Sequence, residues 1–541
     1  MSPAFRLITL VVLSLGLVDR LAAQEPHDHH GETLGHVAFP VSCTPDAQAR
    51  FERAMALLHS FWWEEGARAF RAVAAADSTC AMAYWGQAVN SWGNPFAGGP
   101  SGDNLRRGAA AAVLAGARGA PTARERGFLA AVGALYRDYE TTSNSSRLLA
   151  YSDTLARLYR DFPDDPEVAI YYALSLVATA SPTDTTFSRQ RQAAVILNPL
   201  FRRFPTHPGL AHYIIHANDS PQLASLGLDA ARRYAQIAPS APHAQHMPSH
   251  IFVRLGLWDE TIAANQRSFD AGLEYARVQR LGGVVPEQFH ALDYMVYGYL
   301  QEGRDSVARR TIAQGLALSV VGASDALLAN YNRVAMEARV PLERGDWAAA
   351  ARLPVRAAGQ GGIAEALAHF TRGIGAVRRN DTTQARVEVL ALADIEAALA
   401  GQPGYNWSRL VGTKKQAVAA WLLLAAGDTI GALREAKAAA DVEDVTAKHP
   451  VTPGELLPAR ELEGDLLLAV GRYAAARAAY ETTLQRELGR SRSLFGAARA
   501  AELAGDVTAA RTRYREYLTL MEQSDGTRAE LAIARGALSG R

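Results

Sequence analysis

The apolar positions of this chain recur every three to four residues along most of its length. The stretch from Asp46 to Ser60 has this pattern, and Trp62 to Ala75 and Cys80 to Trp92 follow it after short breaks. Apolar residues at this spacing lie on one face of a helix, and the alternating runs typical of strands are scarce. The pattern therefore predicts an almost entirely helical protein whose helices are joined by short turns.

The later turns share one feature, a glycine that separates two helical stretches rich in alanine. Glycine accommodates the turn conformation, and small alanines let paired helices pack closely. The turn glycines Gly471 and Gly505 are 34 residues apart, as are the helix-opening prolines Pro208 and Pro242. Helix pairs at this period are typical of tetratricopeptide repeats. We expect an all-α, tetratricopeptide-like α-solenoid of roughly eight to ten pairs, with a non-repetitive helical bundle as the alternative.

Length and composition agree with a long repeat array. A chain of 541 residues is too long for one compact core, and with 49% apolar and 21% charged residues it has a globular composition. The 56 basic and 55 acidic residues nearly balance, and no basic stripe with interleaved aromatic residues stands out. Nucleic acid is therefore not an expected partner.

The first residues are typical of an export signal. Arg6 precedes an apolar run from Leu7 to Val18, and Leu21-Ala22-Ala23 offers a small-residue cleavage site before Gln24. An uncleaved anchor helix is the alternative, but the apolar run of about 12 residues is short for a bilayer. We expect a cleaved signal peptide over residues 1–23, an exported protein in the periplasm or outside the cell, and no transmembrane segment afterwards.

The remaining chain divides by composition. Residues 24–44 are polar, and we expect a flexible segment whose His27, His29, His30 and His36 either catch a metal or are simply solvated. The helical repeats that follow are predicted to form an N-terminal block, a His-rich central block and a C-terminal block, over residues 45–200, 201–305 and 306–541 respectively.

Cys43 and Cys80 are the two cysteines of the chain. In an oxidising compartment two cysteines favour one disulfide. The alternative is a pair of free buried thiols that pack as small apolar side chains.

Histidines are concentrated in the central block. Seven of the fourteen histidines fall between His207 and His290, and an even distribution would place about two there. His212 and His216 are four residues apart on an expected helix from Gly209 to Ala217. On the next expected helix, from His243 to Leu255, His246 and His250 have the same spacing. Pro248 inside that helix is expected to kink it or to shift its start.

Three successive first helices of the repeat thus carry histidine, the third being Glu287 to Gln301 with His290. Because first helices lie side by side on the concave wall of such an array, their histidines can converge on a transition metal. Neutral imidazole suits Zn²⁺, Cu²⁺, Ni²⁺ or Fe²⁺. Asp219 and Asp293 are candidate ligands, or acceptors that fix a histidine tautomer. The predicted metal residues are His212, His216, His243, His246, His250, His290, Asp219 and Asp293.

Three segments carry a more specific resemblance: CAMAYWG (Cys80 to Gly86), HYIIHAND (His212 to Asp219) and HAQHMPSHIF (His243 to Phe252). With them the chain resembles a group of exported bacterial tetratricopeptide-repeat proteins over its mature length. The resemblance implies the fold and the export of the chain, and it implies no particular reaction.

Three functions follow from these patterns. The first is a binding scaffold whose concave groove holds a peptide, protein or small ligand, with a His-lined transition-metal site inside. The second is a metal-dependent hydrolase or oxidoreductase that uses the same histidines. The third is an interaction solenoid with purely structural histidines. No HExxH, GxSxG, P-loop or dinucleotide-binding motif is present to assign a reaction.

Overall fold

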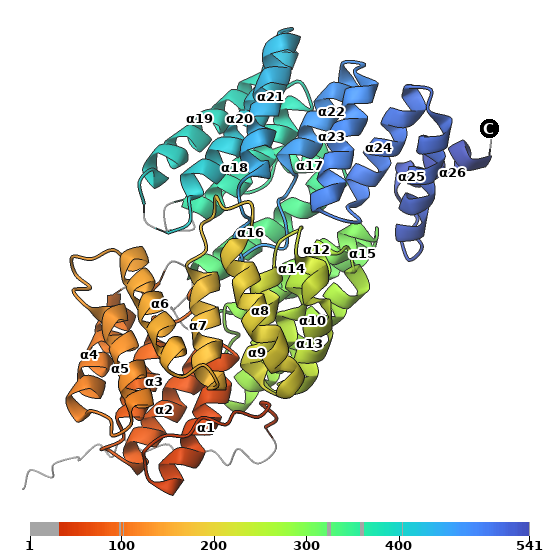
Figure 1. The fold of residues 1–541 in the computed structure, drawn as a ribbon. Helices are drawn as coiled ribbons and strands as arrows, with labels where there is room; N and C mark the ends of the chain where they lie inside the picture. The colour runs from red at the N-terminus through yellow and green to blue at the C-terminus, as the bar shows by residue number, and fades with distance from the viewer. Residues whose placement is uncertain are drawn as a thin grey trace, which may run out of the picture. The chain divides into compact units, whose positions relative to one another are not determined.

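Figure 1 shows the computed structural model, which describes residues 32–96, 99–100, 102–321, 326–356, 362–402 and 404–539. Within these ranges the regular structure is helical, apart from one isolated parallel bridge between Val284 and Val320. The predicted signal peptide and His27, His29 and His30 lie outside the described residues.

The helices follow one another along the chain with short connections. In order, they are α1 Pro45–His59, α2 Trp63–Ala76, α3 Ala81–Trp92, α4 Gly102–Arg118, α5 Ala123–Tyr136, α6 Asn144–Asp161, α7 Pro166–Ala178, α8 Ser188–Arg203, α9 Pro208–Asn218, η1 Ala224–Gly227, α10 Leu228–Ile237, α11 Pro242–His246, α12 Pro248–Arg254, α13 Trp258–Val278, α14 Glu287–Gln301, α15 Asp305–Leu316, α16 Ala326–Glu343, α17 Trp347–Ala351, α18 Ile363–Val377, α19 Thr382–Leu399, α20 Trp407–Ala425, α21 Thr429–Asp444, α22 Ala459–Ala469, α23 Tyr473–Arg486, α24 Ser491–Leu503, α25 Val507–Leu520 and α26 Ala529–Ser539.

Helices adjacent in sequence pack against each other, as Figure 1 shows along the coloured ribbon. Alternate helices also touch, for example α14 with α16, α16 with α18, α18 with α20, α20 with α22 and α22 with α24. Stacking of helix pairs on their neighbours is the architecture of an α-solenoid, in which each pair buries its apolar face on the next. The predicted all-α, tetratricopeptide-like α-solenoid is confirmed.

The turn glycines act as the sequence predicts. Gly471 and Gly505 have φ angles of 74° and 81°, in the left-handed region that only glycine enters without steric cost. After Gly505, the side chain of Asp506 accepts a hydrogen bond from the backbone nitrogen of Ala509 and begins α25. A left-handed glycine and an N-cap together reverse the chain within a few residues.

The second half of the segment predicted to be flexible packs on the repeats. Phe39 is fully buried, with its ring centroid 5.3 Å from that of Phe51 and 5.7 Å from that of Trp85. The backbone nitrogen of His36 donates to the carbonyl oxygen of Thr206 at 3.0 Å. Residues 33–44 therefore differ from the expectation, because Phe39 and its apolar neighbours Leu34 and Val37 enter the core.

Cys43 and Cys80 form a disulfide with an S–S distance of 2.01 Å. The predicted pairing is confirmed, and it ties the N-terminal segment to the start of α3.

The fold brings α9, α11, α12 and α14 together in the central block. The loop that follows α21 also reaches this region, since Lys448 Nζ lies 3.9 Å from Asp219 Oδ2 at the end of α9. Among the described helices, none is long and apolar enough to cross a membrane.

Candidate metal centre

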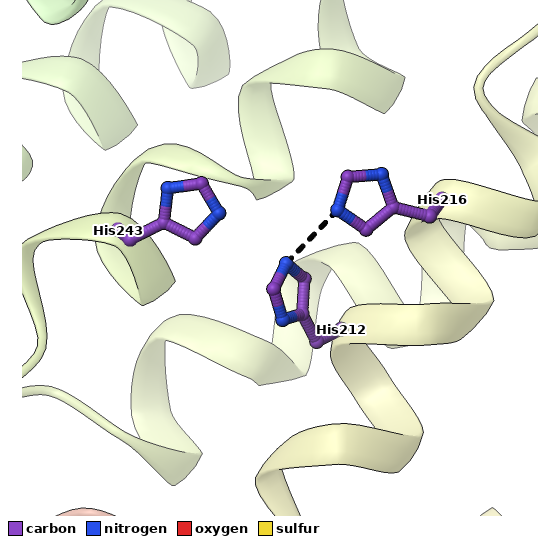
Figure 2. A group of neighbouring side chains, drawn as sticks. All are labelled: His212, His216 and His243. Atoms are coloured by element: carbon purple, nitrogen blue, oxygen red, sulfur yellow. Dashed lines mark hydrogen bonds between the residues drawn. The ribbon is translucent and has the colours of Figure 1, made fainter. Parts of the chain in front are cut away.

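Helix α9 carries the first histidine pair on one face. His212 is fully buried, and its Nδ1 lies 2.6 Å from the carbonyl oxygen of His59. Its Nε2 lies 3.1 Å from Nε2 of His216, one turn later. His243, at the start of α11, faces this pair, and Figure 2 shows the three rings turned toward one another. One nitrogen from each ring lies within 4.8 Å of the others. We call His212, His216 and His243 the first triad.

Helices α11 and α12 carry the second pair across a break at Met247. Pro248 lacks a backbone N–H, so the helix is interrupted there, as the sequence predicts. Met247 nevertheless keeps helical angles (φ −53°, ψ −35°), so His246 and His250 stay on one face. Their Nε2 atoms lie 3.0 Å apart, and His290 of α14 completes the group, with ring nitrogens within 4.8 Å of one another. We call His246, His250 and His290 the second triad.

Hydrogen-bond partners fix the tautomers of His246 and His250 in the second triad. The Asn265 amide nitrogen donates to the carbonyl oxygen of Thr261 at 2.7 Å, so Oδ1 of Asn265 is the atom that faces His246 Nδ1, at 2.6 Å. Nδ1 of His246 must therefore be the protonated donor. His250 Nδ1 lies 2.9 Å from Asp219 Oδ2, so it also donates.

These tautomers leave two lone pairs facing each other. A neutral imidazole has one N–H, and in His246 and His250 the Nδ1 atom carries it. The two Nε2 atoms, 3.0 Å apart, are then both acceptors. Such a contact is repulsive unless a cation, either a proton or a metal ion, lies between the nitrogens.

The first triad is less constrained. His212 Nδ1 donates to a carbonyl oxygen, so its Nε2 is also a lone pair. A neutral His216 can donate its own N–H to that lone pair across the 3.1 Å contact. Either a hydrogen bond or a bound cation therefore satisfies this pair.

Each triad contains a further nitrogen without a hydrogen bond. His243 Nε2 and His290 Nδ1 are buried atoms that have no hydrogen-bond partner within the described part of the chain. Buried polar atoms are usually paired, and an unpaired one needs an explanation such as an ion. A third ligand is thus available to each triad.

The histidines are held in the neutral form that binds metals. Burial, reinforced by His250, lowers the pKa of His246 to about 3. Burial and neighbouring histidines also hold the pKa of His212, His216, His243 and His290 well below the usual value of 6.5. For His216 the largest neighbouring contribution comes from His250 of the other triad. The triads are close, since the ring centroids of His216 and His250 are 6.4 Å apart.

Asp219 and Asp293, the two aspartates predicted as ligands, have different partners. Asp219 accepts from His250 and from Arg254 Nε at 2.9 Å, and Lys448 and Arg254 hold its pKa well below the usual range although burial opposes this. Asp293 instead binds Arg339 through both carboxylate oxygens, at 2.7 and 3.0 Å. The structure therefore brings Asp219 to the second triad and pairs Asp293 with a buried arginine.

A third group of potential ligands was not apparent in the sequence. His59, Glu167 and His207 are buried together, with Glu167 Oε2 3.1 Å from His59 Nε2 and Oε1 2.9 Å from His207 Nε2. His59 Nδ1 also contacts the Tyr213 hydroxyl at 3.0 Å. We call these three residues the enclosed group. Gly209 permits this packing, because a Cβ there would lie 2.5 Å from His59 Nδ1.

Comparisons with known proteins give structural neighbours and no family. No family model and no curated protein sequence matches the chain. Solved structures that match include the human IFIT1 dimer with m7Gppp-AAAA (TM-score 0.31, 10% identity, covering 77% of this chain and 86% of that one). Yeast Tom70 gives a TM-score of 0.28 at 10% identity over 92% and 96% of the two chains. Naa15/Naa10 bound to HypK-THB gives 0.23 at 11% identity over 92% and 75%.

Proposed function

We propose that this protein is an exported α-solenoid binding scaffold that holds transition-metal ions in two adjacent three-histidine sites, the first and second triads. One observation carries the proposal: His246 Nε2 and His250 Nε2 lie 3.0 Å apart, while both Nδ1 atoms are committed as donors. A cation between the two nitrogens turns this repulsive contact into coordination.

A metal ion fits this position better than a proton. Burial lowers the pKa of His246 and of His250, so a shared proton is disfavoured near neutral pH. A divalent ion accepts both lone pairs and adds the unpartnered nitrogen of His290 as a third ligand. In a tetrahedral site with bonds of about 2.0–2.1 Å, ligand nitrogens lie about 3.3 Å apart, close to the observed spacing.

The donor set favours a transition metal. All six ligands are imidazoles, which suit Zn²⁺, copper, iron or nickel, whereas Mg²⁺ and Ca²⁺ require oxygen ligands. Asn265 and Asp219 accept from the outer nitrogens of His246 and His250 and thereby orient these rings, as partners of metal-binding histidines commonly do.

Export and scaffolding rest on different observations. The Cys43–Cys80 disulfide is compatible with an oxidising compartment, and the predicted signal peptide accounts for delivery there. Stacked helix pairs commonly present a concave binding surface, which we expect to hold a peptide, a protein or a small ligand.

A second candidate function is a metal-dependent enzyme, a hydrolase or an oxidoreductase. His216, His243 and His290 are half-buried, and the other three histidines of the triads are buried. Three protein ligands leave a coordination position where a metal ion can polarise or activate a bound molecule. Turnover that disappears with the metal would favour this function over metal binding alone.

Metal content tests the proposal. The untagged chain, with His27, His29 and His30 replaced by alanine, is purified and analysed by elemental mass spectrometry. We expect about two transition-metal ions per chain. H212A/H216A and H246A/H250A should each retain about one, while the control H59Q/H207Q in the enclosed group should retain both. Wild-type metal content no higher than that of a variant lacking all four of the triad residues named here would refute the proposal.

A further inference from the structure

The two triads adjoin each other, so ions bound in them are not independent. The ring centroids of His216 and His250 are 6.4 Å apart, and those of His243 and His246 are 6.1 Å apart. Besides burial, His250 lowers the pKa of His216 in the other triad. Repulsion between two ions grows with the product of their charges, and it is weakly screened in a buried site. We call the two triads together the six-histidine centre.

Nearby groups supply little negative charge to offset bound ions. The ligands are neutral imidazoles, and the acceptors of two of them are a backbone carbonyl oxygen and a side-chain amide oxygen. The carboxylate of Asp219 accepts from His250, but it also binds Arg254 at 2.9 Å and lies 3.9 Å from Lys448. Its negative charge is therefore already matched by these cations. Because a buried charge without a counter-charge is costly, the centre favours ions of low charge.

One aromatic ring lies against all three histidines of each triad. In the first triad this is Phe61, whose ring centroid is 4.4, 5.8 and 5.7 Å from those of the three histidines. In the second triad it is Tyr294, at 4.9, 5.5 and 5.0 Å. The Tyr294 hydroxyl donates to the carbonyl oxygen of Thr452 at 3.3 Å. Since the face of an aromatic ring offers no ligand atom, each triad supplies three nitrogens and has one side covered against a fourth ligand.

We propose that the six-histidine centre binds a pair of copper(I) ions in preference to a pair of divalent ions. Copper(I) is satisfied by three imidazoles, and two such ions repel each other about a quarter as strongly as two Zn²⁺ ions at the same separation. Zn²⁺ instead completes a fourth coordination position, which the aromatic rings hinder. This inference rests on the proposed function, because both triads must bind metal.

Stepwise titration measures the coupling between the two ions. The metal-free chain, with His27, His29 and His30 replaced by alanine, is titrated under argon with Cu⁺ or Zn²⁺ against a competing chelator. H212A/H216A and H246A/H250A each keep one intact triad and report its affinity without a neighbouring ion. The coupling factor is the product of the two wild-type dissociation constants divided by the product of the constants from the two variants.

The two metals should differ in this coupling factor. Because repulsion scales with the product of the charges, the logarithm of the factor should be about four times larger for Zn²⁺ than for Cu⁺. We expect a factor of about three for Cu⁺ and about 100 for Zn²⁺. A factor for Zn²⁺ no larger than that for Cu⁺ would overturn this inference and leave the proposed function intact, whereas no binding of either metal would overturn both. If a variant does not fold, the wild-type chain decides, because its two binding steps must lie further apart for Zn²⁺ than for Cu⁺.

Competition tests the preference directly. With Cu⁺ and Zn²⁺ at equal concentrations, we expect about two copper ions per chain and no zinc by elemental analysis. The control H59Q/H207Q in the enclosed group should give the same result. X-ray absorption at the copper edge should show three nitrogen neighbours for each ion. Zinc in place of either copper ion, or a fourth ligand on copper, would contradict the preference for three-coordinate copper(I).

Discussion

The enclosed group and the second triad both bury clustered histidines, but their hydrogen-bond acceptors lie in different places relative to the rings. In the enclosed group a carboxylate lies between two rings, and Glu167 accepts from His59 and from His207. In the second triad the Asp219 carboxylate and the Asn265 amide oxygen accept from the outer Nδ1 atoms. The Nε2 lone pairs of His246 and His250 therefore face each other. Histidine clustering alone therefore does not indicate a metal site. The position of the acceptors distinguishes the two arrangements.

The carboxylates of the enclosed group and of the second triad also differ in their partners. Burial would raise the pKa of Glu167, but His59 and His207 together lower it to about 2, so the carboxylate stays ionised between the two rings. In the second triad Asp219 is already shared with Arg254 and Lys448. Glu167 thus bonds to both rings of the enclosed group without an ion, although His207 Nδ1 has no hydrogen-bond partner among the described residues, whereas two lone pairs face each other in the second triad.

The largest expected effect comes from removing a ligand of the second triad. H246A should weaken Zn²⁺ binding at that triad at least about 1000-fold, since three ligands become two. Competition with a chelating dye measures the affinity. The matched control H59Q should change the Zn²⁺ affinity less than about threefold. Equal losses of affinity in both variants would contradict the difference between the second triad and the enclosed group.

Removal of the acceptor from the enclosed group should affect stability instead. E167A leaves two buried histidines without their carboxylate and should lower the free energy of unfolding by roughly 3 kcal/mol. Urea denaturation followed by circular dichroism measures this change. Metal content should stay at the wild-type level, and loss of metal from the folded variant would assign this group to the metal centre.

Substitutions of Asp219 and Asp293 provide a closely matched comparison, because the same chemical change is made at two sites with different partners. D219N weakens the acceptor behind His250 and should reduce metal affinity about 10- to 100-fold. D293N changes a carboxylate that binds Arg339 and should lower stability while leaving the affinity within about threefold. Isothermal titration with Zn²⁺ compares the two variants, and the reverse order of affinities would contradict the placement of Asp219.

The smallest expected effect concerns pH. Protons compete with metal for imidazole, and a group whose pKa is lowered takes up its proton only at lower pH. Three exposed histidines with a pKa near 6.5 would lose about 10³-fold in affinity by pH 5.5. Because burial lowers the pKa values of the triads, that of His246 to about 3, we expect less than about a tenfold loss between pH 7.5 and 5.5. A thousandfold loss, measured by competitive titration at each pH, would show that the histidines titrate normally.

Much of this arrangement could be predicted from the sequence, because it depends on local spacing. The four-residue intervals place His212 with His216 and His246 with His250, and the helix repeat brings their helices side by side. The all-α fold follows from the same periodicity. Within the described residues, the break at Pro248 leaves the histidine face intact because Met247 remains helical.

The partners could not be predicted, because they are set by contacts between distant segments. Arg339 comes from α16 to neutralise Asp293, and Lys448 comes from the loop after α21 to approach Asp219. His59 is a single histidine at the end of α1, and helical spacing gives no reason to join it with Glu167 of α7. The difference between the enclosed group and the triads therefore becomes visible only in the three-dimensional structure.

Anomalous X-ray diffraction from crystals of the metal-loaded chain tests the central claim most directly. Data collected on both sides of the absorption edge of the bound metal identify the element and locate each ion. We predict two peaks, one within about 2.0–2.2 Å of nitrogens from His212, His216 and His243, and one at the same distance from nitrogens of His246, His250 and His290. Peaks in the enclosed group, or no peak at either triad in crystals soaked with Zn²⁺, would contradict the account.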